Sequence, residues 1–167
     1  MEITFRKADI NDLELLQHWD KQPHVIDSDP SDDWHWEEEL KRYPAWREQL
    51  MAELNGRPIG FVQIIDPARE DSHYWGTIDS GYRALDIWIG EKEDLGKGYG
   101  TVMMQMAISR CFECKDVTSI LIDPLASNSD AHRFYERLGF RFLEQRVFGD
   151  ENCFVYELTK ADWIRNS

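Results

Sequence analysis

Glycines at alternate positions, Gly96, Gly98 and Gly100, lie between an apolar segment and an amphipathic one. Glycine lets a backbone approach a ligand closely and lets its amide N–H groups point outward. A helix that begins near Thr101 would add the positive end of its dipole. This combination suits a pyrophosphate, although glycine-rich turns also simply connect elements. The dinucleotide pattern G-x-G-x-x-G is absent from this turn, which disfavours a Rossmann site.

A carboxylate, Asp86, lies in the middle of the preceding apolar segment. On a strand it shares a face with Ala84 and Trp88. A carboxylate among apolar neighbours costs free energy unless it is paired or used, so we expect either a salt bridge, for example with Arg83, or a role in chemistry. The chemistry would be proton removal from an ammonium group, because only about a thousandth of a lysine-like amine is neutral at pH 7.

The charge of the chain indicates its partners. The 167 residues carry a formal net charge of -13, which disfavours nucleic acid and anionic membranes and favours cations. An acidic surface that serves solubility alone would look the same. No apolar run is long enough to span a bilayer and the N-terminus resembles no targeting peptide, so we expect a cytoplasmic protein with one domain, residues 1–167. The cysteines and histidines show no ligand spacing that we assign to a metal.

Periodicity and turn signals predict the elements that position these residues. The predicted strands are 3–7, 46–54, 59–65, 84–90, 119–122, 141–148 and 153–158. The predicted helices are 11–19, capped by Asp9, then 32–42, one from 101, and 130–138. Residues 23–33 and 66–80 are predicted polar loops, and Asn55-Gly56 predicts a tight hairpin turn. This order indicates an α/β or α+β fold with a mixed sheet.

Two spaced motifs resemble those of the GCN5-related N-acetyltransferase (GNAT) superfamily. Residues 95–100, L-G-K-G-Y-G, resemble its acetyl-CoA pyrophosphate loop, Q/R-x-x-G-x-G/A, with Leu95 in place of Gln or Arg. Residues 128–140, N-x-x-A-x-x-x-Y-x-x-x-G-F, are similar to its second cofactor motif. The resemblance implies that Asn128 approaches the pantetheine arm and that Tyr135 protonates the leaving thiolate. The cofactor-binding residues it implies are Ile87, Trp88, Ile89, Leu95, Gly96, Lys97, Gly98, Tyr99, Gly100, Thr101, Asn128, Ala131 and Tyr135.

Within the superfamily, Arg83-x-x-Asp86, Asp123-Pro124 and the segment 148–158 resemble the branch that contains aminoglycoside 6'-N-acetyltransferases. The resemblance implies that Asp86 is the base or the amine-binding carboxylate and that Asp123 lines the substrate pocket. Asp123 would equally serve as a turn residue. The predicted catalytic residues are Asp86 and Tyr135, and the predicted substrate-binding residues are Trp75, Asp86, Asp123, Asp150 and Glu151.

The resemblance implies a GNAT-like fold: a mixed, twisted central sheet flanked by helices, with acetyl-CoA where the parallel strands 84–90 and 119–122 splay apart. The expected reaction is direct acetyl transfer to a primary amine of a polycationic small molecule, an aminoglycoside at its 6' amine. The alternatives are a siderophore-precursor or lysine-like N-acyltransferase, a protein N-acetyltransferase, and a non-catalytic acyl-CoA-binding domain. Retention of both Asp86 and Tyr135 argues against the last. A monomer and a homodimer are both compatible with the sequence.

Overall fold

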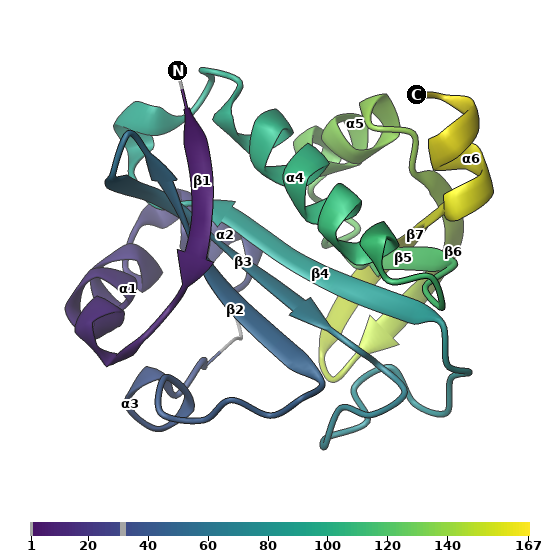
Figure 1. Ribbon diagram of the computed structural model, residues 1–167, viewed down its shortest axis with the longest axis horizontal. Coiled ribbons are helices and arrows are strands. Elements are labelled where there is room, and N and C mark those ends of the chain that lie inside the picture. Colours follow the sequence, from purple (N-terminus) through teal and green to yellow (C-terminus); the bar gives the residue numbers. More distant parts are fainter. Residues whose placement is uncertain (1, 31–32) are drawn as a thin grey trace. The chain divides into compact units, whose positions relative to one another are not determined.

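The computed structural model describes residues 2–30 and 33–167, and its strands form a seven-stranded sheet in the order β1-β2-β3-β4-β5-β7-β6 (Figure 1). The strands are β1 (Ile3–Lys7), β2 (Arg47–Leu54), β3 (Arg57–Ile65), β4 (Tyr82–Ile89), β5 (Ser119–Ile122), β6 (Arg141–Phe148) and β7 (Glu151–Thr159). The α-helices are α1 (Leu13–Asp20), α2 (Pro23–Ser28), α3 (Trp36–Glu39), α4 (Tyr99–Glu113), α5 (Ser129–Arg137) and α6 (Lys160–Arg165). Short 3-10 helices, η1 (Ile10–Asp12) and η2 (Lys92–Asp94), precede α1 and α4.

The sheet is mixed, as predicted. β1 pairs with β2 in antiparallel fashion, whereas β4 and β5 are parallel. The ladder between β4 and β5 joins Tyr82–Ala84 to Ser119–Leu121, and β4 continues beyond it to Ile89. The expected pair of neighbouring parallel strands is therefore present.

The chain divides into two compact units. Unit 1 contains Met1–Gln63 and Asp86–Met104, and unit 2 contains Ile64–Leu85 and Gln105–Ser167. The single domain over residues 1–167 stays a prediction.

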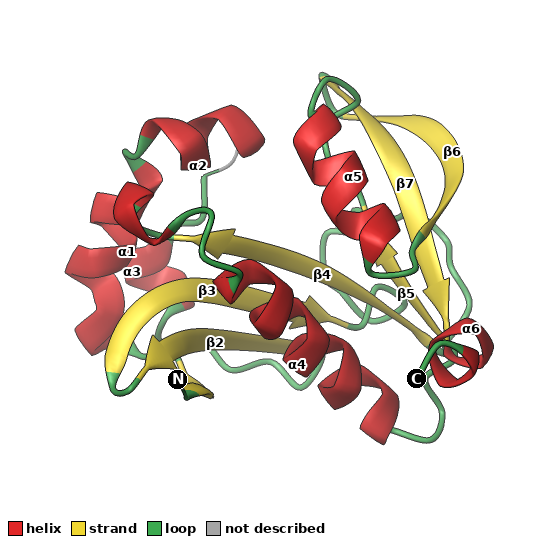
Figure 2. Cartoon of the chain, turned by 90° about the horizontal axis from the view of Figure 1, so that it is seen from above, coloured by secondary structure: helices red, strands yellow, loops and turns green. Residues whose placement is uncertain are grey.

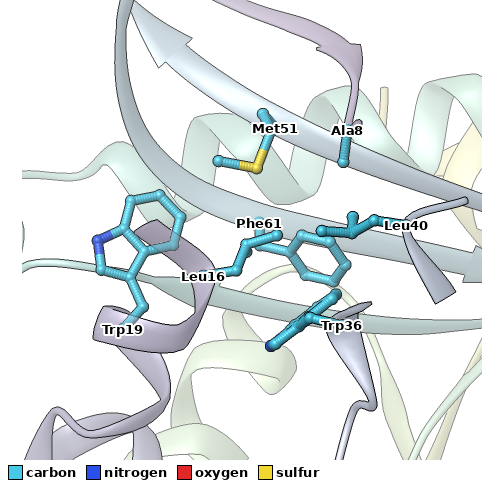
Figure 3. Packing of buried hydrophobic residues seen from close by; sticks show 7 residues of the cluster. All are labelled: Ala8, Leu16, Trp19, Trp36, Leu40, Met51 and Phe61. Atoms are coloured by element: carbon cyan, nitrogen blue, oxygen red, sulfur yellow. The ribbon is translucent and has the colours of Figure 1, made fainter. Parts of the chain in front are cut away.

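The core of unit 1 forms around Phe61 of β3, whose ring lies 5.2 Å from that of Trp36 (Figure 3). The Phe61 ring also lies 4.6 Å from that of Trp88. The buried residues of this cluster are Ala8, Leu16, Trp19, Trp36, Leu40, Met51 and Phe61. The neighbouring Gly60 points to the other face of the strand, where a Cβ would lie 2.7 Å from Cε of Met103 in α4. Helices therefore cover both faces of the strands in this unit.

Unit 2 packs α5 against β7, beside which it runs in Figure 2. The ring of His132 stacks on Phe154 with 4.6 Å between centroids. The hydroxyl of Tyr156 donates a hydrogen bond of 3.2 Å to Glu136. Strand β7 pairs with β5 on one side and with β6 on the other, both antiparallel. Helix α5 therefore packs on the sheet through the aromatic residues of β7.

Several predicted elements differ from the observed ones. Residues 23–28 form α2 and not a loop, because Pro23 stands at the first helical position, where its fixed φ is favourable. The predicted helix 32–42 is only α3, Trp36–Glu39, and its predicted start, Asp32, lies outside the described residues. Asp9 caps η1 and not α1. Helix α6 was not predicted, although the Thr159 hydroxyl caps it by accepting from Asp162 N at 3.1 Å.

Candidate active site

The glycine turn between β4 and α4 exposes its backbone. Gly96 and Gly98 have φ of +72° and +82°, and a Cβ at either would meet nothing within 4 Å. Residues other than glycine rarely adopt such φ values, so the turn needs glycine at these two positions to keep its shape. Gly100 already lies in the first turn of α4, which begins at Tyr99 and not at Thr101 as predicted.

This turn fits the pyrophosphate that the sequence predicts. Its open backbone leads directly into the N-terminus of α4, a helix of 15 residues whose first amides have no partner within the helix. Leu95 and Lys97 are exposed beside it, with the ammonium of Lys97 available to an anion. Tyr99 is half-buried and Thr101 is exposed on the first turn of the helix.

An ion pair anchors the start of the turn. Arg57 at the start of β3 donates from Nη1 and Nη2 to the two carboxylate oxygens of Asp94, at 2.9 and 3.1 Å. Asp94 is only 4% exposed, and it directly precedes Leu95. The hydrogen bond from Arg57 lowers the pKa of Asp94 from its ordinary value, against the opposing effect of burial. This bidentate contact fixes where the glycine turn leaves η2.

Asp86 is half-buried on β4, and it accepts a hydrogen bond from a neutral side chain. Nε2 of Gln63 on β3 lies 3.0 Å from Oδ2 of Asp86. Arg83, the predicted alternative partner, forms an ion pair with Asp66, at 3.6 Å. A neutral donor orients a carboxylate without cancelling its charge, and an oriented carboxylate can bind an ammonium group or take its proton.

The next residues of β4, Ile87, Trp88 and Ile89, are half-buried. The Trp88 ring packs into the core of unit 1, and its Nε1 is buried with no hydrogen-bond partner among the described residues. The carbonyl of Ile89 lies 2.8 Å from Nε2 of His24 in α2. The cofactor contacts of these residues stay a prediction, and His24 is a neighbour of this backbone that the sequence did not indicate.

The second predicted cofactor motif lies on α5 in unit 2. Asn128 is the N-cap of the helix, and its Oδ1 accepts from Ala131 N at 3.2 Å. Tyr135 is half-buried, one helical turn after Ala131 on the same face. Its ring lies 5.2 Å from Phe134 and 5.8 Å from Phe140. The motif therefore has a structural role in capping and packing beside any role in binding.

The predicted acidic residues of unit 2 lie on two segments that pair with each other. The segment after β5 pairs with the start of β7, through Phe154 N to Pro124 O at 2.9 Å and Ala126 N to Asn152 O at 2.8 Å. Leu125 pairs with Cys153 in antiparallel fashion, so Asp123 lies towards Val155 and not at the turn that carries Asp150 and Glu151. Asp150 is exposed and Glu151 is half-buried.

The loop 66–80 contributes two adjacent aromatic residues with different environments. Tyr74 is 45% exposed, and its hydroxyl donates to Asp123 at 2.5 Å. Trp75 is only 4% exposed, because Phe148 and Arg146 cover it. Its part in substrate binding stays a prediction that the burial does not favour, whereas Tyr74 faces the predicted site.

The predicted site residues are thus divided between the units. Asp86–Ile89 and Leu95–Thr101 lie in unit 1, and Trp75, Asp123, Asn128, Ala131, Tyr135, Asp150 and Glu151 lie in unit 2. Gln63, His24, Tyr74 and Arg146 were missed as neighbours of these residues. Across residues 2–30 and 33–167, no group of metal-ligating side chains is assembled and no helix is both long and apolar enough to cross a membrane.

Comparison with known proteins identifies the family. The family model described as an Acetyltransferase (GNAT) domain matches residues 9–148. Aminoglycoside N(6')-acetyltransferase type 1 of Klebsiella pneumoniae is 30% identical over 152 residues, which cover 83% of this chain and 73% of that protein. The lysine N-acyltransferase MbtK of Mycobacterium tuberculosis is 24% identical over 170 residues, covering 92% of this chain and 75% of that protein.

Solved structures agree with the family model. The aminoglycoside acetyltransferase AAC(6')-Ib in complex with coenzyme A and kanamycin superimposes with a TM-score of 0.86 at 26% identity, covering 98% of both chains. The predicted fold and the predicted cofactor, acetyl-CoA, are confirmed at the level of the family. The chain belongs to the GNAT family of acetyltransferases, enzymes that transfer an acyl group from acetyl-CoA.

Proposed function

We propose that this acetyltransferase modifies a primary amine of a polycationic small molecule, namely the 6' amine of an aminoglycoside. The observation that carries the proposal is Asp86, a half-buried carboxylate that accepts a hydrogen bond from the neutral amide of Gln63. The similarity to aminoglycoside N(6')-acetyltransferase type 1 and to a structure that contains kanamycin supports the same acceptor. The acidic residues Asp123, Asp150 and Glu151 and the net charge of -13 favour an acceptor with several positive charges.

Acetyl-CoA supplies the acetyl thioester. We assign the pyrophosphate to the backbone of residues 95–100 and the N-terminus of α4, including Lys97, Tyr99 and Thr101. We assign further cofactor contacts to the backbone of Ile87–Ile89 and to Asn128 and Ala131. The open turn and the helix dipole support the first assignment, since together they offer unpaired N–H groups to an anion.

The chemistry needs one proton acceptor and one proton donor. Asp86 accepts a proton from the acceptor's ammonium group, so that the neutral nitrogen can form the amide bond as the thioester C–S bond breaks. Tyr135 gives its hydroxyl proton to the departing sulfur, and the second proton that the nitrogen loses on forming the amide restores this hydroxyl, directly or through solvent. Each step is assigned to one side chain, so each can be tested alone.

A thiol-release assay with acetyl-CoA tests the proposed acceptor. Kanamycin, an Nε-hydroxylysine siderophore precursor and a lysine peptide are compared as acceptors. We expect thiol release that depends on kanamycin. Release with the lysine-derived acceptors alone would replace the proposal with the second candidate, an N-acyltransferase like MbtK, which the similarity over 92% of this chain favours. Release with none of them would contradict both.

The Asp86→Asn variant tests the proposed base. It keeps the shape of the side chain and removes its charge, and we expect kcat to fall by about a hundredfold or more with acetyl-CoA binding retained. Asp79→Asn is the matched control, because Asp79 is an exposed loop residue. Equal kcat values for wild type and Asp86→Asn would remove Asp86 from this role.

We also propose that residues 1–167 act as one catalytic domain in the cytoplasm, as a monomer or a homodimer. The family model supports the single domain, because it runs through residues of both units without interruption. The cytoplasm is the compartment in which acetyl-CoA is available to such an enzyme.

A further inference from the structure

A buried carboxylate holds the backbone of the loop between β3 and β4. Glu70 is 7% exposed, and its Oε1 accepts from Ser72 Oγ at 2.8 Å and from Tyr74 N at 2.9 Å, while Oε2 accepts from Ser72 N. Burial alone would raise the pKa of Glu70, but the hydrogen bonds from Tyr74 and Ser72 outweigh it and lower the pKa. The backbone at Tyr74 is therefore held by an ionised, buried acceptor.

Two side chains of strand β6 also hold this loop. Nη2 of Arg146 donates to the carbonyl of Trp75 at 3.1 Å, and its guanidinium lies 4.8 Å from the centroid of Phe148. The ring of Phe148 stacks on that of Tyr74, with centroids 4.5 Å apart and planes 3° from parallel. The Tyr74 ring thus has a defined plane although nearly half of its surface is exposed.

With its backbone and ring held, the Tyr74 hydroxyl has a defined position. This hydroxyl donates to Oδ2 of Asp123 at 2.5 Å, across 49 residues of sequence. A phenol at neutral pH carries no charge, so it orients the carboxylate without neutralising it. An arginine or lysine in its place would neutralise the carboxylate. An oriented, charged carboxylate loses less side-chain entropy when it binds an ammonium group.

We propose that Tyr74 is a positioning residue that holds the Asp123 carboxylate in the orientation that binds a positive group of the acceptor. This inference rests on the proposed function for its substrate, an acceptor with more than one ammonium group. Tyr74 acts through Asp123 and through the stack on Phe148, and it takes no part in proton transfer. Acceptors with several charges should therefore depend on Tyr74 more than acceptors with a single amine.

The Tyr74→Phe variant removes the hydroxyl and keeps the stacked ring. We expect KM for kanamycin to rise ~5-fold, the worth of about one oriented hydrogen bond, with kcat and KM for acetyl-CoA unchanged. The KM for a monoamine such as glucosamine should rise less than the KM for kanamycin. Tyr43→Phe is the matched control, because Tyr43 is an exposed tyrosine remote in sequence from this loop. An unchanged KM for kanamycin, or equal losses with both acceptors, would overturn the inference while the proposed function stands.

A second measurement does not depend on turnover. The free energies of unfolding of Tyr74→Phe, Asp123→Asn and the double variant form a double-mutant cycle. We expect the double variant to lose less than the sum of the single losses. If the wild type acetylates no aminoglycoside, the proposed function fails and this cycle still decides whether Tyr74 holds Asp123. Additive losses would overturn that contact.

Discussion

Gln63 and Asp86, on neighbouring strands of unit 1, are joined by a hydrogen bond of 3.0 Å from the amide nitrogen to the carboxylate. Gln49 on β2 donates in turn to Oε1 of Gln63, at 3.1 Å. Because its oxygen is engaged by Gln49, Gln63 turns its NH2 group towards Asp86. A row of neutral amides therefore orients the proposed base from one side, and its effect on the reaction can be measured.

Replacement of Gln63 by leucine removes this donor with little change in volume. We expect kcat with kanamycin to fall about tenfold, the loss of one hydrogen bond to a charged group, while KM for acetyl-CoA stays near its wild-type value. Steady-state kinetics check this, with Gln105→Leu as the control, since Gln105 is exposed on α4. A kcat equal to that of the wild type would show that Asp86 is oriented by other contacts.

Tyr135→Phe deletes the hydroxyl proposed to protonate the departing sulfur. The ring contacts with Phe134 and Phe140 remain, so the fold should not change. We expect kcat to fall roughly 100-fold, in the range of general acid catalysis, with acetyl-CoA binding retained in calorimetry. If kcat is retained, solvent protonates the thiolate and Tyr135 serves packing alone.

Gly90 should not tolerate a methyl group. A Cβ at this position would lie 2.0 Å from Cε2 of the fully buried Trp19. We expect Gly90→Ala to lower the free energy of unfolding by about 1–3 kcal/mol through overpacking, as measured by urea denaturation. Trp19→Leu should make the added methyl group less harmful, so the double variant should be more stable than the two single losses predict. Additive losses would place the strain elsewhere.

The ion pair of Arg57 and Asp94 should make stability depend on pH in the acid range. The pKa of Asp94 is lower in the folded chain than its ordinary 3.8, first through its hydrogen bond from Arg57 and against burial. The pair therefore stabilises the fold fully above about pH 4, and this contribution disappears as the pH falls through the folded pKa.

Arg57→Met measures that contribution. Arg57 is 54% exposed in its side chain, so solvent screens the pair and we expect a loss of ~1 kcal/mol or less at pH 7. The difference in the free energy of unfolding between wild type and variant should shrink as the pH falls from about 4 through the lowered pKa of Asp94 in the folded chain. Urea denaturation at pH 7 and at a pH below about 4 checks this. A difference that is the same at both would contradict the assignment to Asp94.

Local signals in the sequence predicted the parts of the fold that depend on neighbouring residues. Asn55-Gly56 predicts a tight turn, and both residues have the positive φ values, 51° and 87°, that such a turn needs. Strand β6 occupies its predicted range and ends directly before Gly149. Pro23 in a polar segment predicts a loop, yet proline is also favoured at the first position of a helix, where the structure has it.

The neighbours of the predicted site residues depend on contacts that no local pattern contains. Arg146 reaches the carbonyl of Trp75 across 71 residues, and Tyr74 reaches Asp123 across 49. The burial of Trp75 follows from these long-range contacts, since Arg146 and Phe148 lie over its ring. Motif spacing indicated which residues belong to the family's chemistry, whereas the side chains that orient them came only from the folded chain.

The anchoring of the loop 66–80 has a consequence for how such an enzyme can diversify. Its attachment points, Glu70 and the carbonyl of Trp75, bracket Tyr74 within a few residues. Insertions between β3 and Glu70, or between Gly76 and β4, would leave this short segment and its hydroxyl in place. Evolution can therefore lengthen the loop on either side of this segment while the hydrogen bond from Tyr74 to Asp123 is inherited unchanged.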